Sequence, residues 1–371
     1  MSLSMGIVGL PNVGKSTLFN ALTEKEVPAE NYPFCTIDPS VGIVAVPDAR
    51  LDALARLSQS QKKIPAVVEF VDIAGLVEGA SKGEGLGNKF LSHIREVDAI
   101  LHLVRIFEIK DDSATEQTHV YGSIDPLRDM KVINMELMLA DMESIQKRLA
   151  KIARDVKRGD ASALKEEKIL KKLMLSLEDE QMLSSLDLDE DERAIVKQLH
   201  LLTMKPMLYA FNKKAGGKNL DEENPELFQE IVDEVENAGF QYLLIDAKTE
   251  EDISTLESEE RDMMREALAQ HNGIDKLIQK SYELLGLITF FTTGEKETRA
   301  WTIKKGSLAP QAGAAIHSDF EKQFIRAQVI QWEELLEAGS FAQARSLGKL
   351  RTEGKEYLVQ DGDVIEFLLN N

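Results

Sequence analysis

The sequence predicts an α/β domain built on a parallel sheet, with a pair of long helices inserted into it and a smaller α+β domain after it. Short apolar segments alternate with helical patterns early in the chain, which is typical of a parallel sheet covered on both faces. A heptad-like apolar repeat then replaces this alternation, and strand-like segments with Gly-containing turns follow Leu284. The 371 residues leave room for two or three domains.

The predicted α/β domain consists of residues 1–130 and 205–283. Its helix starts at Lys15, next to the first strand, and ends at Ala21. The predicted strands are Met5–Val8, Ala66–Ile73, Ala99–Val104, Pro206–Phe211 and Tyr242–Ile245. The last two strands resume the alternation of strands and helices seen in residues 1–130. We therefore expect the residues between 130 and 205 to be an insertion in this domain.

The insertion, residues 131–204, has the apolar spacing of a coiled coil. Intervals of three and four residues separate Met135, Met138, Met142, Ile145, Leu149, Ile152 and Val156. Gly159-Asp160 offers a turn, and a second helical stretch places Leu170, Leu173 and Leu177 on one face. We expect an antiparallel helical hairpin. Two ordinary core helices are the alternative, which the high charge of the stretch disfavours.

Residues 284–371 are predicted to form a small mixed α+β domain. A helix is expected around Phe320–Ile325. The strand candidates are Leu287–Phe291, Arg299–Ile303, Tyr357–Val359 and Val364–Leu368. The turns between them contain glycine, as is usual between short strands.

The composition excludes several classes of protein. With 43% apolar and 29% charged residues the chain is expected to fold. No apolar run approaches the roughly 18 residues of a membrane span, and the first residues lack the flanks of a signal peptide. A single cysteine, Cys35, excludes an internal disulfide and a Cys-based zinc cluster. We expect a soluble, cytoplasmic protein with no membrane partner.

The net charge of −20, from 44 basic and 64 acidic residues, disfavours nucleic acid as a general partner, and no DNA specificity is expected. One segment departs from this average. Residues Lys147 to Lys172 contain ten basic and four acidic residues, and Glu178–Glu192 after them is acidic. The basic segment predicts an RNA-contacting hairpin tip, including Arg154, Lys157 and Arg158; the alternative is the solvated face of an exposed helix.

The segment Gly9–Ser16 matches G-x-x-x-x-G-K-[ST], directly after a strand and before a helix, which is the context this phosphate-binding motif requires. Its glycines let the backbone wrap a phosphate, and the helix N-terminus favours negative charge. Lys15 would reach the β- and γ-phosphates, and Ser16 would ligate Mg²⁺. The predicted nucleotide contacts in this loop are Asn12, Val13, Gly14, Lys15, Ser16 and Thr17.

Two downstream segments supply the other groups that a magnesium–nucleotide site needs. Thr36, in a loop after the first helix, is the candidate second Mg²⁺ ligand, with a plain loop threonine as the alternative. A strand then ends in D-x-x-G, where Asp72 would hold Mg²⁺ through water and the Gly75 N–H would contact the γ-phosphate. The glycine-rich Glu78–Asn88 fits a loop that orders on nucleotide binding, or a flexible loop without switching.

The residue after D-x-x-G is Leu76, where small GTPases usually have a glutamine that orients the attacking water. A hydrocarbon cannot do this, so another residue must, or hydrolysis is slow. His119, in a polar loop, is the best candidate because an imidazole can polarise water; the alternative is a surface histidine. His93 and His102 lie in patterns that indicate packing.

The base-recognition motif is incomplete. Guanine specificity normally comes from N-K-x-D, whose aspartate accepts hydrogen bonds from the base, but this chain ends the motif with Ala215. An asparagine can meet the N6/N7 edge of adenine, so Asn212 favours ATP or relaxed specificity. Lys213 completes the motif, and Asp246 and Ala247 stand where a loop often backs the base.

These motifs together resemble the YchF/Obg-like ATPases, a family in the Obg-related branch of P-loop GTPases. The resemblance covers almost the whole chain and includes GLPNVGKST at Gly9–Thr17, NYPFCTIDP at Asn31–Pro39, DIAGLVEGASKGEGLGNKF at Asp72–Phe90, and the hairpin. It implies a P-loop NTPase domain with an inserted coiled-coil hairpin and a C-terminal TGS domain, a ubiquitin-like β-grasp module. The chain departs from the family at Ala215, usually Glu, and at Asp246, usually Ser.

The resemblance also carries functional expectations. It implies that ATP is preferred over GTP, that the protein associates with ribosomes and their RNA, and that His119 is the catalytic histidine, by the similar VRIFE…HV segment. A K⁺ requirement in this branch would point to Asn12 as a ligand. We therefore expect an ATPase switch with slow intrinsic hydrolysis, in which Lys15 and His119 act in catalysis. The alternatives are a GTP-specific translational GTPase and a nucleotide-responsive scaffold with negligible turnover.

Overall fold

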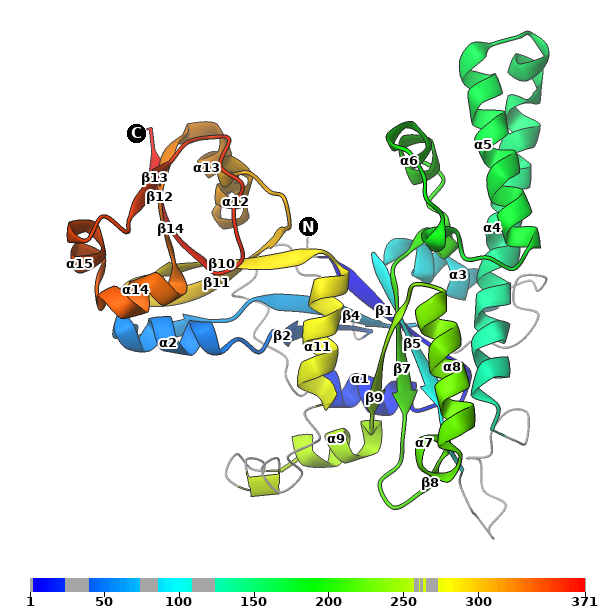
Figure 1. Cartoon of the computed structure of the whole chain (residues 1–371), viewed down its shortest axis with the longest axis horizontal. Coiled ribbons are helices and arrows are strands. Elements are labelled where there is room, and N and C mark those ends of the chain that lie inside the picture. The colour runs from blue at the N-terminus through cyan, green and yellow to red at the C-terminus, as the bar shows by residue number, and fades with distance from the viewer. Residues whose placement is uncertain are drawn as a thin grey trace.

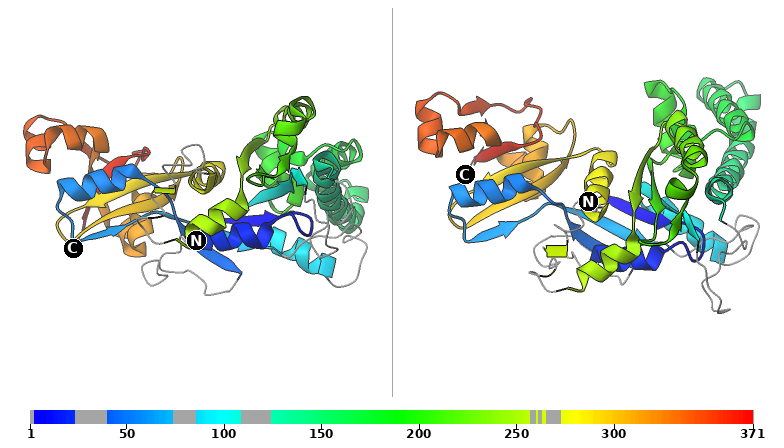
Figure 2. Two further views of the ribbon diagram at one scale, coloured as in Figure 1. Left: turned by 90° about the horizontal axis from the view of Figure 1, so that it is seen from below. Right: turned by 60° about the horizontal axis from the view of Figure 1, so that its bottom comes forward.

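Two six-stranded sheets organise the chain in the computed structural model (Figure 1). The structure describes residues 3–23, 40–73, 86–108, 124–256, 260, 263–264 and 273–370. The sheets lie towards opposite ends of an elongated molecule, and two long helices stand beside the first sheet, away from the second (Figure 2). No helix in these segments is long and apolar enough to cross a membrane.

The first sheet has the strand order β2-β4-β1-β5-β7-β9. Its strands are β1 (Ser4–Val8), β2 (Val41–Ala45), β4 (Val67–Asp72), β5 (Ala99–Arg105), β7 (Met207–Asn212) and β9 (Gln241–Ile245). Five strands are parallel, and β2 runs antiparallel to β4 at the edge. The five predicted strands of this part are confirmed. The edge strand β2 was not predicted, because it is only five residues long and contains a glycine.

The register of this sheet brings the carboxyl ends of its parallel strands to one edge. Ile7 in β1 lies beside Asp72 in β4, and Arg105 in β5 lies beside Asn212 in β7. Asn212 in turn lies beside Ile245, the last residue of β9. In open α/β sheets this edge is where ligands bind.

Helices cover the first sheet and connect its strands. The helix α1 (Lys15–Thr23) packs beside α9 (Ala247–Ser254), and α11 (Gly273–Leu284) contacts β4, β7 and β9. The helix α8 (Pro225–Asn237) packs on β9, and α3 (Leu86–Glu96) precedes β5. The short elements α7 (Leu220–Glu223) and β8 (Lys218–Asn219) lie near the ligand-binding edge (Figure 1). The two-residue strand β6 (Phe107–Glu108) pairs with β8.

The long helices are α4 (Pro126–Lys157) and α5 (Ala161–Glu178), an antiparallel pair at the upper right of Figure 1. Gly159, with a φ of 80°, makes the turn between them, and the Asp160 side chain caps α5 by accepting from the Ala163 N–H. Ile145 and Ile152 are buried on α4, as Leu170 and Leu173 are on α5. After α5 come the 3₁₀ turn η2 (Leu183–Ser185), the helix α6 (Glu190–Lys197) and the 3₁₀ turn η3 (Leu202–Met204).

The predicted apolar seam of the first long helix is wrong at its start. Met135 is 38% exposed, whereas Ile133 and Leu137 are fully buried. The reason is that the first half of α4 packs against β5 of the sheet, so its buried face is set by the sheet instead of by α5. Only the later half of α4 belongs to the helical pair, and the alternative of an ordinary core helix applies to the first half.

The second sheet has the order β13-β12-β14-β10-β11-β3. Its strands are β10 (Leu287–Thr293), β11 (Glu297–Lys304), β12 (Phe324–Gln331), β13 (Arg351–Glu353), β14 (Asp363–Leu369) and β3 (Lys62–Ile64). The helices α12 (Ala309–Ile316), α13 (Ser318–Gln323), α14 (Trp332–Ala338) and α15 (Phe341–Ser346) join them. The mixed α+β character predicted for this part of the chain agrees with the structure.

Two predicted elements of this part are corrected by the structure. The predicted strand Tyr357–Val359 makes only an isolated bridge between Leu308 and Leu358. The helix predicted around Phe320–Ile325 ends at Gln323, and Phe324 begins β12. Phe324 is 3% exposed in an aromatic core, and this tertiary packing overrides the local helical pattern.

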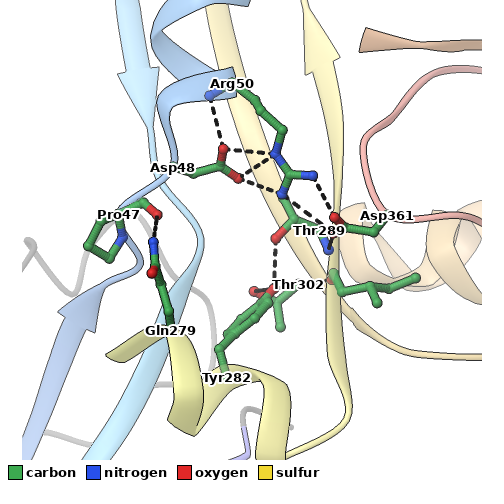
Figure 3. A network of polar contacts seen from close by, with 9 residues as sticks. Pro47, Asp48, Arg50, Gln279, Tyr282, Thr289, Thr302 and Asp361 are labelled. Carbon is green, nitrogen blue, oxygen red and sulfur yellow. Dashed lines mark hydrogen bonds and ion pairs between the residues drawn. The ribbon is translucent and has the colours of Figure 1, made fainter. Parts of the chain in front are cut away.

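A segment from early in the chain is built into the second sheet. The strand β3 pairs parallel with β11, and α2 (Ala49–Leu57) packs on β10 and β11. At the start of α2, Arg50 bonds Asp48 at 2.8 Å and Asp361 at 2.5 Å (Figure 3). The Tyr282 hydroxyl, also in Figure 3, lies 3.0 Å from the Thr289 hydroxyl. The division of the chain at residues 131, 205 and 284 stays a prediction.

Candidate nucleotide site

The loop between β1 and α1 has the backbone that its motif predicts. Asn12 and Gly14 both have positive φ, 61° and 100°. A Cβ at Gly14 would lie 2.5 Å from the Asn212 side-chain nitrogen, so this position requires glycine for both its conformation and its space. The first turn of α1 then begins at Lys15, and its N-terminus faces the loop. A loop of this form with a helix N-terminus favours a bound phosphate.

The Lys15 side chain lies back across the loop. Its Nζ donates to the carbonyl oxygen of Leu10 at 3.3 Å. Burial lowers the pKa of Lys15, and the nearby charge of Asp72 partly opposes that effect. A long hydrogen bond to one neutral carbonyl is a weak replacement for water, so an anionic ligand near this ammonium is strongly favoured.

Asp72, the last residue of β4, presents a carboxylate beside the same loop. Within the described segments its Oδ1 is buried and makes no hydrogen bond. Burial raises the pKa of Asp72, and the charge of Lys15 lowers it. A buried carboxylate oxygen without a partner is costly, and a hydrated cation would supply the missing contact.

These residues fit Mg²⁺ bound together with a nucleotide. Mg²⁺ usually keeps several waters and takes one or two protein ligands plus phosphate oxygens. Ser16, at the start of α1, and Asp72 supply ligand oxygens of that kind at the same edge of the sheet. The described segments contain no group of three or more His, Cys, Asp or Glu that can hold a metal by itself. The candidate ligand Thr36 lies outside the described residues.

Asn212 holds two loops of the site together. Its Nδ2 donates to the Val13 carbonyl at 2.8 Å, and its Oδ1 accepts from the Ala247 N–H at 3.0 Å. The residue is 3% exposed. The sequence suggested contact with the adenine edge, but in this structure both polar ends of the amide bond the protein. Asn212 therefore positions the phosphate loop against the start of α9.

The other residues of the base motif are also bonded within the protein. Asp246 caps α9 by accepting from the Thr249 N–H at 2.9 Å, and its second oxygen accepts from the Ala215 N–H at 2.6 Å. Lys213 donates from its side chain to Asp221 at 2.6 Å and to Glu222. Although burial opposes it, these carboxylates raise the pKa of Lys213. Neither acidic partner was predicted from the sequence.

A cavity of about 260 Å³ connects the phosphate loop with the base motif. Its lining combines backbone of the loop with several cationic side chains: Asn12, Gly14, Thr17, Arg105, Phe107, Asn212, Lys213, Lys214 and Lys248. A second cavity of about 460 Å³ lies beyond it, between Ala215, Asp246 and Lys276. Together they offer a concave space next to the phosphate loop with the size of a nucleotide pocket.

Arg105 is a site residue that sequence reasoning missed. It ends β5, is 2% exposed, and donates from Nη1 to the Asn12 carbonyl at 3.3 Å. Its Nε donates to the Phe107 carbonyl at 3.0 Å, and its guanidinium lies 4.5 Å from the Phe107 ring centroid. An arginine at the end of a strand that is apolar except for His102 was the available signal, because such a strand ends at the ligand-binding edge.

The structure thus brings most of the predicted nucleotide contacts to one edge of the sheet. They are Asn12, Val13, Gly14, Lys15, Ser16, Thr17, Asp72, Asn212, Lys213, Asp246 and Ala247. Gly75, Leu76 and His119 lie outside the described residues, so their roles stay predictions. His102 is buried against Tyr209, and burial lowers its pKa to about 3, which agrees with the packing role expected for it.

The phosphate loop, its lysine and the carboxylate of the neighbouring strand define a P-loop nucleotide-binding protein. A family model described as "50S ribosome-binding GTPase" matches residues 4–134. The YchF-type GTPase C-terminal model, described as "Protein of unknown function (DUF933)", matches residues 287–370.

Full-length relatives narrow this class to one family. The chain is 52% identical to the "Ribosome-binding ATPase YchF" of Bacillus subtilis (strain 168), with 100% of each chain covered. It is 47% identical, with the same coverage, to the protein of that name from Escherichia coli O157:H7. The structure of the Schizosaccharomyces pombe YchF GTPase matches it with a TM-score of 0.86 and 37% identity, over 99% of this chain and 98% of that chain. The chain belongs to the YchF family, as the motifs predicted.

Proposed function

We propose that this protein is a Mg²⁺-dependent ATPase that acts on or near the ribosome in the cytoplasm. The observation that carries the proposal is that, among the residues the structure describes, Lys15 and Asp72 make few hydrogen bonds beside a preformed phosphate loop. The names of the full-length relatives, which call them ribosome-binding ATPases, support the same activity.

The P-loop residues bind and orient the triphosphate. Lys15 and the loop N–H groups contact the β- and γ-phosphates, and Arg105 keeps the Asn12 carbonyl in place. Ser16, Thr36 and, through water, Asp72 would hold Mg²⁺. Bound there, Mg²⁺ would neutralise charge on the β- and γ-phosphates.

The preference for ATP over GTP rests on a missing acceptor. Guanine-specific sites use a carboxylate at the fourth position of the base motif, and this chain has Ala215 there. The nearby Asp246 carboxylate already accepts from two backbone N–H groups. GTP therefore lacks the fourth-position carboxylate that guanine-specific sites offer to the base, and we expect it to bind more weakly than ATP. A K⁺ ion, if required, would be held at Asn12.

Hydrolysis is expected to be slow without a stimulating partner. Leu76 cannot orient water, and His119 is proposed to position the attacking water instead. Contacts of the γ-phosphate with Thr36 and Gly75 would order their loops. The coiled-coil pair α4–α5 and a C-terminal TGS-like β-grasp domain would then transmit that state to the ribosome.

The test combines binding and turnover. Calorimetry with ATP, GTP and their diphosphates, with Mg²⁺ and with or without K⁺, is expected to show tighter binding of ATP. Phosphate release should fall at least about 100-fold in His119→Ala, the low end for general acid–base catalysis. His93→Ala is the matched control, because His93 is exposed on α3.

Three outcomes would contradict parts of the proposal. Tighter binding of GTP would favour a GTP-specific translational GTPase. Binding without phosphate release would favour a nucleotide-responsive scaffold. An unchanged rate in His119→Ala would remove that residue from the mechanism.

A further inference from the structure

The ion pairs of the basic segment, Lys147 to Lys172, are of two kinds: those within the α4–α5 pair and those with α6. Most remain within the α4–α5 pair, such as Arg148 with Glu166 at 2.5 Å and Lys171 with Glu167 at 2.9 Å. Two lysines of α5 instead pair with α6: Lys165 with Asp191 and Lys172 with Glu192. The acidic stretch Glu178–Glu192 follows the basic segment in the sequence, and its last two residues contact lysines of that segment on α5.

The contact with α6 is regular. Lys165 Nζ lies 2.5 Å from the Asp191 carboxylate, and Lys172 Nζ lies 3.0 and 3.2 Å from the two Glu192 oxygens. The lysines are seven residues apart, which places them on one face of α5 about 10 Å apart along its axis. Lys168 lies between them, and its charge is among the causes that lower the pKa of Glu192, after the Lys172 hydrogen bond. All three lysines are exposed.

The start of α6 is held in place by its own backbone bonds. The Asp189 side chain accepts from the Glu192 N–H at 2.7 Å, and the Glu192 side chain accepts from the Asp189 N–H at 3.0 Å, which forms a capping box. On the same helix, Val196 is 2% exposed in the apolar core. The carboxylates of α6 are therefore presented to α5 from a defined position.

The two α6 carboxylates cover part of a row of three lysines on α5. Such a row is a surface that an anionic polymer can bind. Lys165 and Asp191 are both exposed, and Lys172 is exposed although its partner Glu192 is half-buried. Ion pairs that water reaches are weak and are screened by salt, so another anion can replace them. A polymer with regularly spaced phosphates competes best, because it engages several lysines at once and releases its counterions. The long lysine side chains can turn from α6 to such a polymer without a change in the fold.

We propose that the lysine face of α5, formed by Lys165, Lys168 and Lys172, is a binding surface for RNA phosphates, and that the acidic start of α6 competes with RNA for it. This inference rests on the proposed association with ribosomes. It adds a surface on α5 to the predicted contacts of Arg154, Lys157 and Arg158 at the tip, and it gives the hairpin a built-in competitor.

The experiment compares two double variants with equal charge. Asp191→Asn with Glu192→Gln removes both carboxylates that contact the lysines, and the new amide oxygen can still accept the capping hydrogen bond. The control, Asp187→Asn with Glu190→Gln, removes two charges from the same segment, and in the described structure neither residue makes an ion pair. Binding of a short RNA hairpin to the full chain is measured by fluorescence anisotropy over a series of KCl concentrations. Thermal melting confirms that each variant is folded.

We expect the first variant to bind RNA at least about threefold more tightly than the control. Its plot of log affinity against log salt should be steeper by roughly one to two units, because two more lysines contact phosphates. Adding Lys165→Gln and Lys172→Gln to this variant should abolish both gains.

The outcomes separate the inference from the proposed function. Equal affinity and slope in the first variant and the control would overturn the competition by α6. Gains that survive the two lysine substitutions would overturn the assignment of the surface to α5. Absence of RNA binding in every protein, including the wild type, would overturn the proposed RNA contact of the hairpin as a whole, while leaving the nucleotide site untouched.

Discussion

The two ends of the nucleotide site differ in how their polar groups are bonded. At the phosphate end, within the described part of the chain, Lys15 has one long bond to a backbone carbonyl and Asp72 has a buried oxygen without a partner. At the base end, Asn212, Lys213 and Asp246 each make at least two hydrogen bonds to the protein.

Because of this difference, the two ends of the site should contribute differently to nucleotide affinity and to selectivity between bases. Groups without partners gain the most from a ligand, so the phosphate end should supply most of the binding free energy. Groups that are already bonded give up protein bonds to reach a base, so the base end should act as a scaffold that discriminates weakly by hydrogen bonding. The largest effects of mutation are accordingly expected at the phosphate end.

Lys15→Gln should give the largest loss. Removal of a charge-assisted contact to phosphate costs about 1.5–3 kcal/mol, so ATP affinity should fall by roughly 10- to 150-fold in calorimetry. Lys214→Gln is the control, because this exposed lysine lines the same cavity near the base end. Comparable losses in the two variants would contradict the assigned difference between the two ends.

Asp72→Asn should reduce ATP affinity about 10-fold when Mg²⁺ is present, because the amide is a poorer partner for a hydrated cation than a carboxylate. With EDTA in place of Mg²⁺, this loss should disappear, and affinity should be no lower than that of the wild type, because the amide does not repel the phosphates. An equal loss in both conditions would show that Asp72 does not act through the metal. Titration of each protein with ATP in the two buffers is sufficient.

The same substitution should stabilise the nucleotide-free protein at neutral pH. Burial raises the pKa of Asp72 in the folded state, so this group favours folding below its unfolded pKa and loses that contribution as pH rises through the folded value. Because the group is only half-buried, the gain in unfolding free energy should stay below about 1 kcal/mol. Urea unfolding should show the gain at pH 7 and its disappearance near the unfolded pKa. Lower stability of the variant at pH 7 would contradict the burial argument.

The predictable part of the site is the part encoded by neighbouring residues. Gly9–Ser16 specifies a phosphate loop because strand, turn and helix follow one another within a few residues. The role of Asn212 was not predictable, because its partner Val13 lies 199 residues away in the chain. The acidic partners of Lys213 and the support of Asn12 by Arg105 likewise depend on how the strands align.

In the fold, too, local features were predictable from the sequence and contacts between distant segments were not. Strands buried on both faces, such as Ala99–Arg105, are visible as apolar runs in the sequence. The pairing of Lys62–Ile64 with the second sheet was not visible, because the strand is short and two of its three residues are exposed. The burial pattern of α4 at Met135 was mispredicted for a related reason: the spacing of apolar residues does not tell which neighbour a helix packs against.

Asn212→Ala tests the central claim, that the base end is a scaffold, most directly. Both ATP and GTP are titrated with Mg²⁺ into the wild type and the variant. Loss of the bonds to Val13 and Ala247 loosens the phosphate loop, so we predict that both affinities fall by the same factor, about 10-fold, with an unchanged ratio of ATP to GTP affinity. A fall for ATP alone, with GTP unaffected, would show that Asn212 reads adenine and would contradict the account.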